Sequence, residues 1–181
     1  MAGLRIDKCC LAIIDIQGKL AQLMYDKHRL FRNSVILLKT ARILQIPILY
    51  TQQCPENLGP TIPQIAKLLS DCEPINKATF SCCGHEQFND KLSGLNRRQV
   101  LLCGIEAHIC IYQTAVDLIE NGWDVSVIAD AVSSRKLQNK EIALSKLAHI
   151  GTNIISTEML VFELLKTAEH PKFKQIAKLI K

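Results

Sequence analysis

Short apolar runs alternate with longer amphipathic segments along the chain. The apolar runs are nearly continuous, as expected of strands that are buried on both faces of a sheet. They predict strands over residues 10–15, 47–51, 75–77, 99–105, 125–129 and 153–156.

Amphipathic segments separate these runs. Residues 27–45 bring apolar side chains close to one helical face, and similar stripes run through 111–119 and 142–148. Shorter helices are predicted over 62–69 and 86–93. The alternation of strand and helix predicts an α/β fold, with a mainly parallel sheet and helices on both faces. In such sheets ligands bind beyond the carboxyl ends of the strands, which indicates where a site should lie.

The composition fits one globular domain over residues 1–181. The chain is 48% hydrophobic and 22% charged, without an internal repeat or a linker. No apolar stretch reaches the ~20 residues that a bilayer requires, and the first run is too short for a signal peptide. We therefore expect a cytoplasmic protein that does not bind membranes, with a nuclear or mitochondrial location left open.

The net charge of +5 is concentrated in the last eleven residues, PKFKQIAKLIK, which hold four lysines and no acid. Phe173, Ile176 and Ile180 give this segment an apolar helical face. We expect a C-terminal helix that docks on the body of the protein or on a second subunit. The segment does not have the form of a nucleic-acid or membrane-surface motif.

The chain contains eight cysteines, but they do not form a disulfide pattern. Cys9, Cys10 and Cys103 lie inside apolar runs, where a free cysteine behaves as a small hydrophobic residue. The sequence Cys82-Cys83-Gly84-His85 lacks a second ligand pair at the spacing of a zinc finger. We expect reduced cysteines, no metal and no other cofactor.

Three chemically capable side chains follow predicted strands. Asp15 ends the first strand, Lys77 ends the third, and Cys110 follows the fourth in GIEAHIC. A thiol attacks as its thiolate, and a helix N-terminus and a nearby lysine both favour that form. A carboxylate within reach can take the thiol proton and later return it to a leaving group. The three residues together indicate nucleophilic catalysis at one edge of the sheet.

The same stretches resemble the isochorismatase-like cysteine hydrolases. The similar motifs are DIQ after the first strand, NKATFS after the third, GIEAHIC after the fourth, and WDVSVIADAVSSR beyond it. They occur in the family's order and span nearly the whole chain. Within the family, CGIEA and the C-terminal HPKFKQIAKLIK resemble the eukaryotic isochorismatase domain-containing proteins.

This resemblance implies a three-layer α/β/α fold with a six-stranded, mainly parallel, Rossmann-like sheet. It implies a catalytic triad of Asp15, Lys77 and Cys110. It also implies a cis peptide bond between Ile105 and Glu106, which turns the N–H groups of Glu106 and Cys110 toward an oxyanion.

The resemblance further implies a pocket and an assembly. Gln17 and Phe80 are expected to line the substrate pocket, and His108 is expected to shape its mouth or to lie exposed. Family members are commonly dimers or tetramers, so a homo-oligomer is implied. The expected substrate is a small-molecule amide or ester that is hydrolysed through a thioester on Cys110.

Two departures from other family members narrow this expectation. Nicotinamidases of the superfamily bind zinc with an Asp-x-His pair and another His beyond the second strand, where this chain reads YTQQCPENLGP. We therefore expect neither a metal nor nicotinamidase activity. Enzymes that hydrolyse isochorismate cleave a vinyl ether and do not require a cysteine nucleophile, so Cys110 favours hydrolysis of a C–N bond or an ester.

Several alternatives stay open. His85 is able to approach the site as a base, whereas His108, two residues before Cys110, is turned away from it on a helix. DIQGKL has a single glycine, too few for a dinucleotide-binding turn. Cys82 and Cys83 lie near the proposed site and allow a thiol-redox role. The principal alternative to hydrolysis is a binding or regulatory role with slight turnover.

Overall fold

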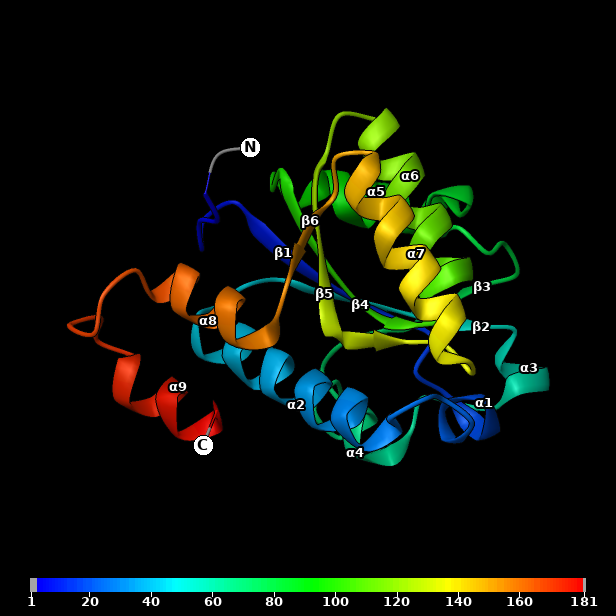
Figure 1. The fold of residues 1–181 in the computed structure, drawn as a ribbon, viewed down its shortest axis with the longest axis horizontal. Coiled ribbons are helices and arrows are strands. Elements are labelled where there is room, and N and C mark those ends of the chain that lie inside the picture. The colour runs from blue at the N-terminus through cyan, green and yellow to red at the C-terminus, as the bar shows by residue number, and fades with distance from the viewer. Residues whose placement is uncertain (1–2, 181) are drawn as a thin grey trace.

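A computed structural model describes residues 3–180 of the protein. Six strands form one parallel sheet in the order β3-β2-β1-β4-β5-β6 (Figure 1). The strands are β1 (Cys9–Ile14), β2 (Ile48–Gln53), β3 (Ile75–Lys77), β4 (Gln99–Ile105), β5 (Asp124–Ser133) and β6 (Asn153–Ile155). The strand order reverses between β1 and β4, and open α/β sheets bind ligands at the carboxyl ends of the strands at such a point.

The two central strands are apolar on both faces. Every residue of β1 and of β4 is buried, which explains why both appear in the sequence as continuous apolar runs. Leu11 of β1 is in register with Ile48 of β2 on one side and with Leu101 of β4 on the other. The residues that directly follow β1 and β4 therefore lie side by side in the middle of the sheet edge.

Helices cover both faces of the sheet, in the three-layer arrangement that the sequence predicted (Figure 1). One face is covered by α2 (Lys27–Ile43), α4 (Pro63–Ala66), α8 (Thr157–Leu165) and α9 (Phe173–Ile180). The other face is covered by α5 (Glu86–Gly94), α6 (Tyr112–Glu120) and α7 (Leu137–His149). Two short helices, α1 (Gly18–Gln22) and α3 (Pro55–Leu58), lie together where the loops after β1 and β2 meet. A separate apolar core fills the space on each side of the sheet.

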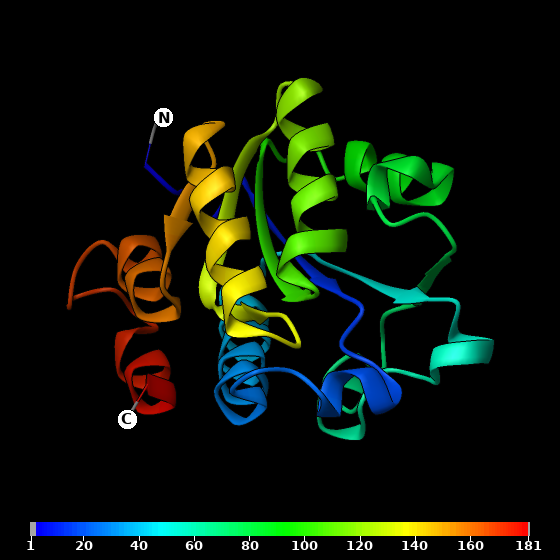
Figure 2. The ribbon, with the colours of Figure 1, turned by 45° about the vertical axis from the view of Figure 1, so that its right-hand side comes forward.

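The C-terminal helix docks on the body, as one of the two sequence expectations proposed. Ile176 of α9 is fully buried, and α9 (red in Figure 2) contacts α2 (blue) and α8 (orange). Lys174 and Lys178 are exposed on its other side, while Lys181 lies outside the described residues. The lysines of this segment are thus the solvated face of an amphipathic helix.

Several predicted boundaries differ from those in the structure. The fifth strand was expected over 125–129 but extends to Ser133, because its pairing with β4 resumes at Gly104 after a shift of register. The second strand continues two residues past the predicted 47–51, to Gln53. Helices α1, α3 and α8 were not expected. Within residues 3–180, no helix is long and apolar enough to cross a membrane.

Candidate active site

Asp15 directly follows β1 and is buried, with 2% of its surface exposed. Its backbone turns into the left-handed region (φ 53°), which ends the strand and directs the side chain toward the neighbouring strand ends. Aspartate tolerates this conformation better than most residues. The carboxylate accepts hydrogen bonds from Thr51 Oγ1 at 2.7 Å and from Lys77 Nζ at 2.8 Å.

Lys77 is the last residue of β3, and its side chain is fully buried. Besides Asp15, its ammonium group faces Gln53 Oε1 at 2.6 Å and the backbone carbonyls of Thr79 and Phe80 at 3.1 and 3.3 Å. Burial, the largest single effect, lowers the pKa of Lys77, but the charge and hydrogen bond of Asp15 together with the neighbouring Cys82 and Cys110 outweigh it, and the pKa is raised. The lysine is therefore a fixed positive charge in the interior.

Between β4 and α6 the backbone passes close to β1 and then forms a π-helical turn. Gly104 lies at φ 130°, and a Cβ there would come within 2.0 Å of the carbonyl oxygen of Ile14. The next peptide bond, between Ile105 and Glu106, is cis. Residues 107–111 then form a π-helical turn (Ala107–Ile111) that leads into α6 and contains Cys110.

Cys110 is 6% exposed and lies beside both Asp15 and Lys77. Burial and the Asp15 carboxylate raise its pKa to about 12, against the opposing effect of Lys77. The sequence indicated a thiol that a helix N-terminus and a lysine would ionise. The structure differs from this expectation, because the lysine charge is already paired with Asp15 and the pKa of Cys110 is raised instead of lowered.

A cavity of about 220 Å³ opens at this edge of the sheet. It is bounded by Asp15, Leu20, Gln53, Leu58, Phe80, Ile105, Glu106, Ile109, Cys110 and Arg135. The expected residues Asp15, Cys110 and Phe80 thus share one cavity, with Lys77 hydrogen-bonded to the carboxylate from behind.

Gln17 does not line the cavity, although the sequence led us to expect it there. It is completely buried, and its amide forms hydrogen bonds with the backbone N–H and carbonyl of Gln53 and with the carbonyl of Gly59. Gln17 therefore connects the loops beside the cavity. His108 is partly exposed and contacts Ser134 Oγ at 2.9 Å and Asn139 Nδ2 at 3.3 Å, so it links the π-helical turn to the end of β5 and to α7.

Three groups in the cavity wall were missed from the sequence. Gln53 orients the Lys77 ammonium group, as described above. The Glu106 carboxylate accepts hydrogen bonds from the backbone N–H of Arg135 at 2.9 Å and from its Nε at 3.2 Å. Gln53 is the last residue of β2, and Arg135 lies two residues after β5. A search for polar residues at the carboxyl ends of the strands, which located Asp15 and Lys77, would therefore have found both if the strand limits had been predicted correctly.

The other candidates from the sequence lie outside the cavity wall. His85 caps α5, and its Nδ1 is buried without a hydrogen-bond partner. Cys82 packs in the same apolar core as Cys110, and burial raises its pKa to about 12. All eight cysteines are free. Across residues 3–180, no three His, Cys, Asp or Glu side chains are grouped as metal ligands.

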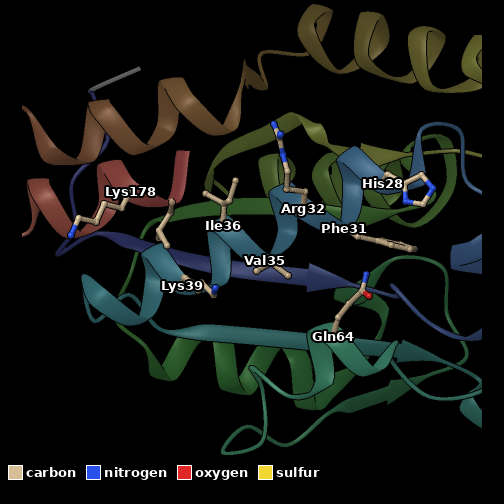
Figure 3. A pocket seen from close by; sticks show the side chains of 9 residues that line it. His28, Phe31, Arg32, Val35, Ile36, Lys39, Gln64 and Lys178 are labelled. Carbon is tan, nitrogen blue, oxygen red and sulfur yellow. The ribbon is translucent and has the colours of Figure 1, made fainter. Parts of the chain in front are cut away.

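A larger hollow of about 440 Å³ lies on the outside of the helical layer (Figure 3). Its walls come from α2, α4 and α9, and its polar residues are His28, Arg32, Lys39, Gln64 and Lys178. Its lining residues include neither a carboxylate nor a thiol, so of these two cavities it is the smaller one that holds the candidate nucleophile.

Comparisons with known proteins agree with this geometry. Residues 9–159 match the Isochorismatase domain family. Isochorismatase domain-containing protein 2 of Danio rerio is 38% identical over 170 residues, which cover 94% of this chain and 85% of the relative. This relative belongs to the eukaryotic isochorismatase domain-containing proteins, the group that the sequence motifs resemble, and the match spans most of the chain.

Two solved structures share the fold. A structure described as MAR1 ribonuclease from Caenorhabditis elegans has a TM-score of 0.93 and 36% identity, covering 99% of this chain and 92% of that one. The YcaC gene product from Escherichia coli, described as an octameric hydrolase of unknown specificity, has a TM-score of 0.94 at 20% identity. This match covers 99% of this chain and 90% of the E. coli chain.

Proposed function

The chain belongs to the isochorismatase family, and from this we propose that it hydrolyses a small-molecule amide or ester through a thioester on Cys110. The observation that carries the proposal is the buried Asp15–Lys77 ion pair beside Cys110, in a cavity at the carboxyl ends of β1 and β4. A volume of about 220 Å³ suits a small substrate, since one water occupies about 30 Å³ in the liquid.

In the proposed reaction Asp15 acts as general base and then as general acid. As the sulfur of Cys110 bonds to the carbonyl carbon of the substrate, the thiol proton passes to the Asp15 carboxylate. The substrate C–N or C–O bond then breaks, and the leaving group departs with that proton. A water molecule attacks the thioester, gives a proton to Asp15, and releases the acid, while the proton returns to the sulfur of Cys110.

Lys77 stays protonated throughout this cycle. It faces the Asp15 carboxylate at rest, and it stabilises negative charge on the sulfur after the proton has moved to Asp15. Its contact with Gln53 Oε1 keeps the ammonium group in place during that exchange. The backbone N–H groups of Glu106 and Cys110 are the proposed donors to the oxyanion, and both residues border the cavity.

The test is a panel of small amides and slow esters, followed by intact-mass measurement and peptide mapping. We expect an acyl adduct on Cys110 that hydroxylamine removes, and steady release of the acid product. Cys110→Ala should abolish both, whereas Cys83→Ser, a change at a half-buried thiol outside the cavity, should not. The absence of both adduct and turnover across the panel would favour a binding or regulatory role.

Cleavage of RNA is a second candidate, because the C. elegans relative is described as a ribonuclease. A short RNA therefore belongs in the same panel. Hydrolysis of the RNA, lost in Cys110→Ala, would replace the amide or ester proposal.

A homo-oligomer is part of the proposal, since the E. coli structure of the same fold is described as octameric. Light scattering coupled to size exclusion measures the mass of the assembly directly. A mass of 20.3 kDa, that of one chain, at micromolar concentration would contradict it.

A further inference from the structure

Four charged side chains meet around the cavity, and they form two ion pairs. Asp15 is paired with Lys77 at 2.8 Å, and Glu106 is paired with Arg135 at 3.2 Å. Each carboxylate is nearly inaccessible, with 2% of the Asp15 side chain and 5% of the Glu106 side chain exposed. The formal charges of these four groups cancel.

Glu106 accepts hydrogen bonds from both the backbone and the side chain of Arg135. Its Oε2 accepts from the backbone N–H of Arg135, and both of its carboxylate oxygens lie 3.2 Å from the arginine Nε. The arginine side chain is 56% exposed and lies at the cavity mouth, while the carboxylate lies inside. An anion that enters the cavity therefore approaches a buried carboxylate, and the positive charge beside it is already compensated.

The rest of the cavity wall is mainly apolar. Leu20, Leu58, Phe80, Ile105 and Ile109 provide hydrocarbon surface, and Gln53 is a neutral amide whose oxygen is bonded to Lys77. A charged substrate would lose its hydration in such a cavity and gain no unpaired counter-charge among the residues that line it. An uncharged amide or ester avoids that cost.

We propose that the cavity accepts an uncharged substrate, and that Glu106 determines this by compensating the charge of the Arg135 guanidinium group, which would otherwise favour a carboxylate. The proposal rests on the proposed function and specifies its substrate class: a small, neutral, largely apolar amide or ester. Glu106 is thus a specificity-determining residue as well as a member of the turn that carries Cys110.

Two alkylating reagents of nearly equal size test this at Cys110 without knowledge of the substrate. Iodoacetamide is neutral and iodoacetate is anionic, and peptide mapping gives the rate of each at Cys110 at pH 8. The ratio of the two rates is divided by the same ratio for N-acetylcysteine. In the wild-type protein we expect Cys110 to disfavour the anion by roughly tenfold more than the free thiol does.

Two variants should move this ratio in opposite directions. Glu106→Gln keeps an acceptor for Arg135 but frees its positive charge, so it should reduce the discrimination against iodoacetate to about that of the free thiol or below. Arg135→Gln leaves the Glu106 carboxylate uncompensated and should increase it. Glu158→Gln, the same change at an exposed residue of α8, should leave the ratio as it is in the wild type.

The outcomes separate the two proposals. If iodoacetate reacts at Cys110 as well as it does with the free thiol, or if Glu106→Gln leaves the ratio unchanged, the inference is overturned and the hydrolase proposal stands. If neither reagent reacts at Cys110 in the folded protein, the cavity does not admit a small neutral amide and the inference is overturned, while the panel of amides and slow esters tests the proposed function separately. The wild-type ratio and Arg135→Gln decide the question if Glu106→Gln does not fold.

Discussion

Asp15 and Lys77 are held in the interior by contacts that satisfy both charges. The carboxylate has Thr51 on one oxygen and the ammonium group on the other, and the ammonium group has three further oxygen acceptors. A buried charge that loses its partner is destabilising, whereas removal of both charges together costs much less. The contributions of Asp15 and Lys77 to the free energy of unfolding are therefore strongly coupled.

Lys77→Met should lower the free energy of unfolding by about 3–5 kcal/mol, because it leaves the Asp15 carboxylate buried without its counter-charge. Asp15→Asn in the same chain should recover most of this loss. Urea unfolding of the two single variants and the double variant measures the coupling. Asp7→Asn, which breaks the exposed Arg5–Asp7 pair, is the control and should have no measurable effect. Additive effects at Asp15 and Lys77 would contradict the pairing.

The three proposed catalytic residues could be located from the sequence because each lies at the end of a predicted strand or in the turn that follows it. Gln53 was missed for a local reason: QQ at the end of β2 is polar, so the run seemed to end at Thr51. The Glu106 carboxylate was missed for a different reason. Its partner Arg135 lies 29 residues further along the chain, and no local pattern reports such a contact.

At the scale of elements, the approach of β1 to β4 shapes the site. Ile14 and Gly104 are in register, and the space between the strands at this point has no room for a side chain. Gly104 also has a backbone conformation, φ 130°, that residues with a Cβ rarely adopt. The glycine in CGIEAHIC is thus required by both the packing and the backbone.

Gly104→Ala should destabilise the protein by ~2 kcal/mol or more and displace the turn that carries Cys110. Gly94→Ala is the matched control, since a Cβ at that end of α5 meets no atom within 4 Å. It should be neutral or stabilise by about 0.5 kcal/mol. Thermal unfolding of both variants distinguishes these cases. Equal midpoints for Gly104→Ala and the wild type would refute the steric argument.

Helices and strands with a clear pattern of apolar residues were predictable from the sequence, and those that depend on tertiary contacts were not. The central strands and α2 follow from burial on two faces and on one face, respectively. The second half of β5 reads ADAVS, and it is a strand because its backbone pairs with Gly104 and Ile105 of β4. The short α1 and α3 depend on each other and on the loops around them.

At the scale of the whole molecule, the cysteines are part of both apolar cores. Five of them are buried, namely Cys9, Cys10, Cys82, Cys103 and Cys110. Burial raises the pKa of each to about 11 or 12, well above the ordinary value of a cysteine thiol. The folded protein therefore keeps these thiols protonated at a pH where the unfolded chain releases the protons.

This predicts a fall in stability at alkaline pH. Below pH 9 both states hold the protons, so the contribution is complete; between pH 9 and about 11 the unfolded state binds fewer protons and gains stability. Each buried thiol contributes up to ~1.4 kcal/mol per pH unit in that range. Urea unfolding at half-unit steps from pH 7 to 10.5 measures the slope.

A matched variant isolates the contribution of one thiol. Cys10→Val replaces a fully buried thiol in β1 with a side chain of similar size that does not titrate. In this variant the free energy of unfolding should fall less steeply above pH 9, and the difference in slope from the wild type is the contribution of one cysteine. A free energy of unfolding that stays constant from pH 8 to 10.5 in the wild type would show that these thiols do not control the alkaline limit.

The raised pKa of Cys110 also bears on reactions other than the proposed one. Peroxides, stray electrophiles and soft metal ions react with thiolates, and burial together with the Asp15 carboxylate favours the protonated thiol. In the proposed mechanism the sulfur is a latent nucleophile, because Asp15 takes the thiol proton only as a substrate carbonyl accepts the electron pair. On this mechanism, one arrangement gives Cys110 both resistance to stray electrophiles and reactivity toward its substrate.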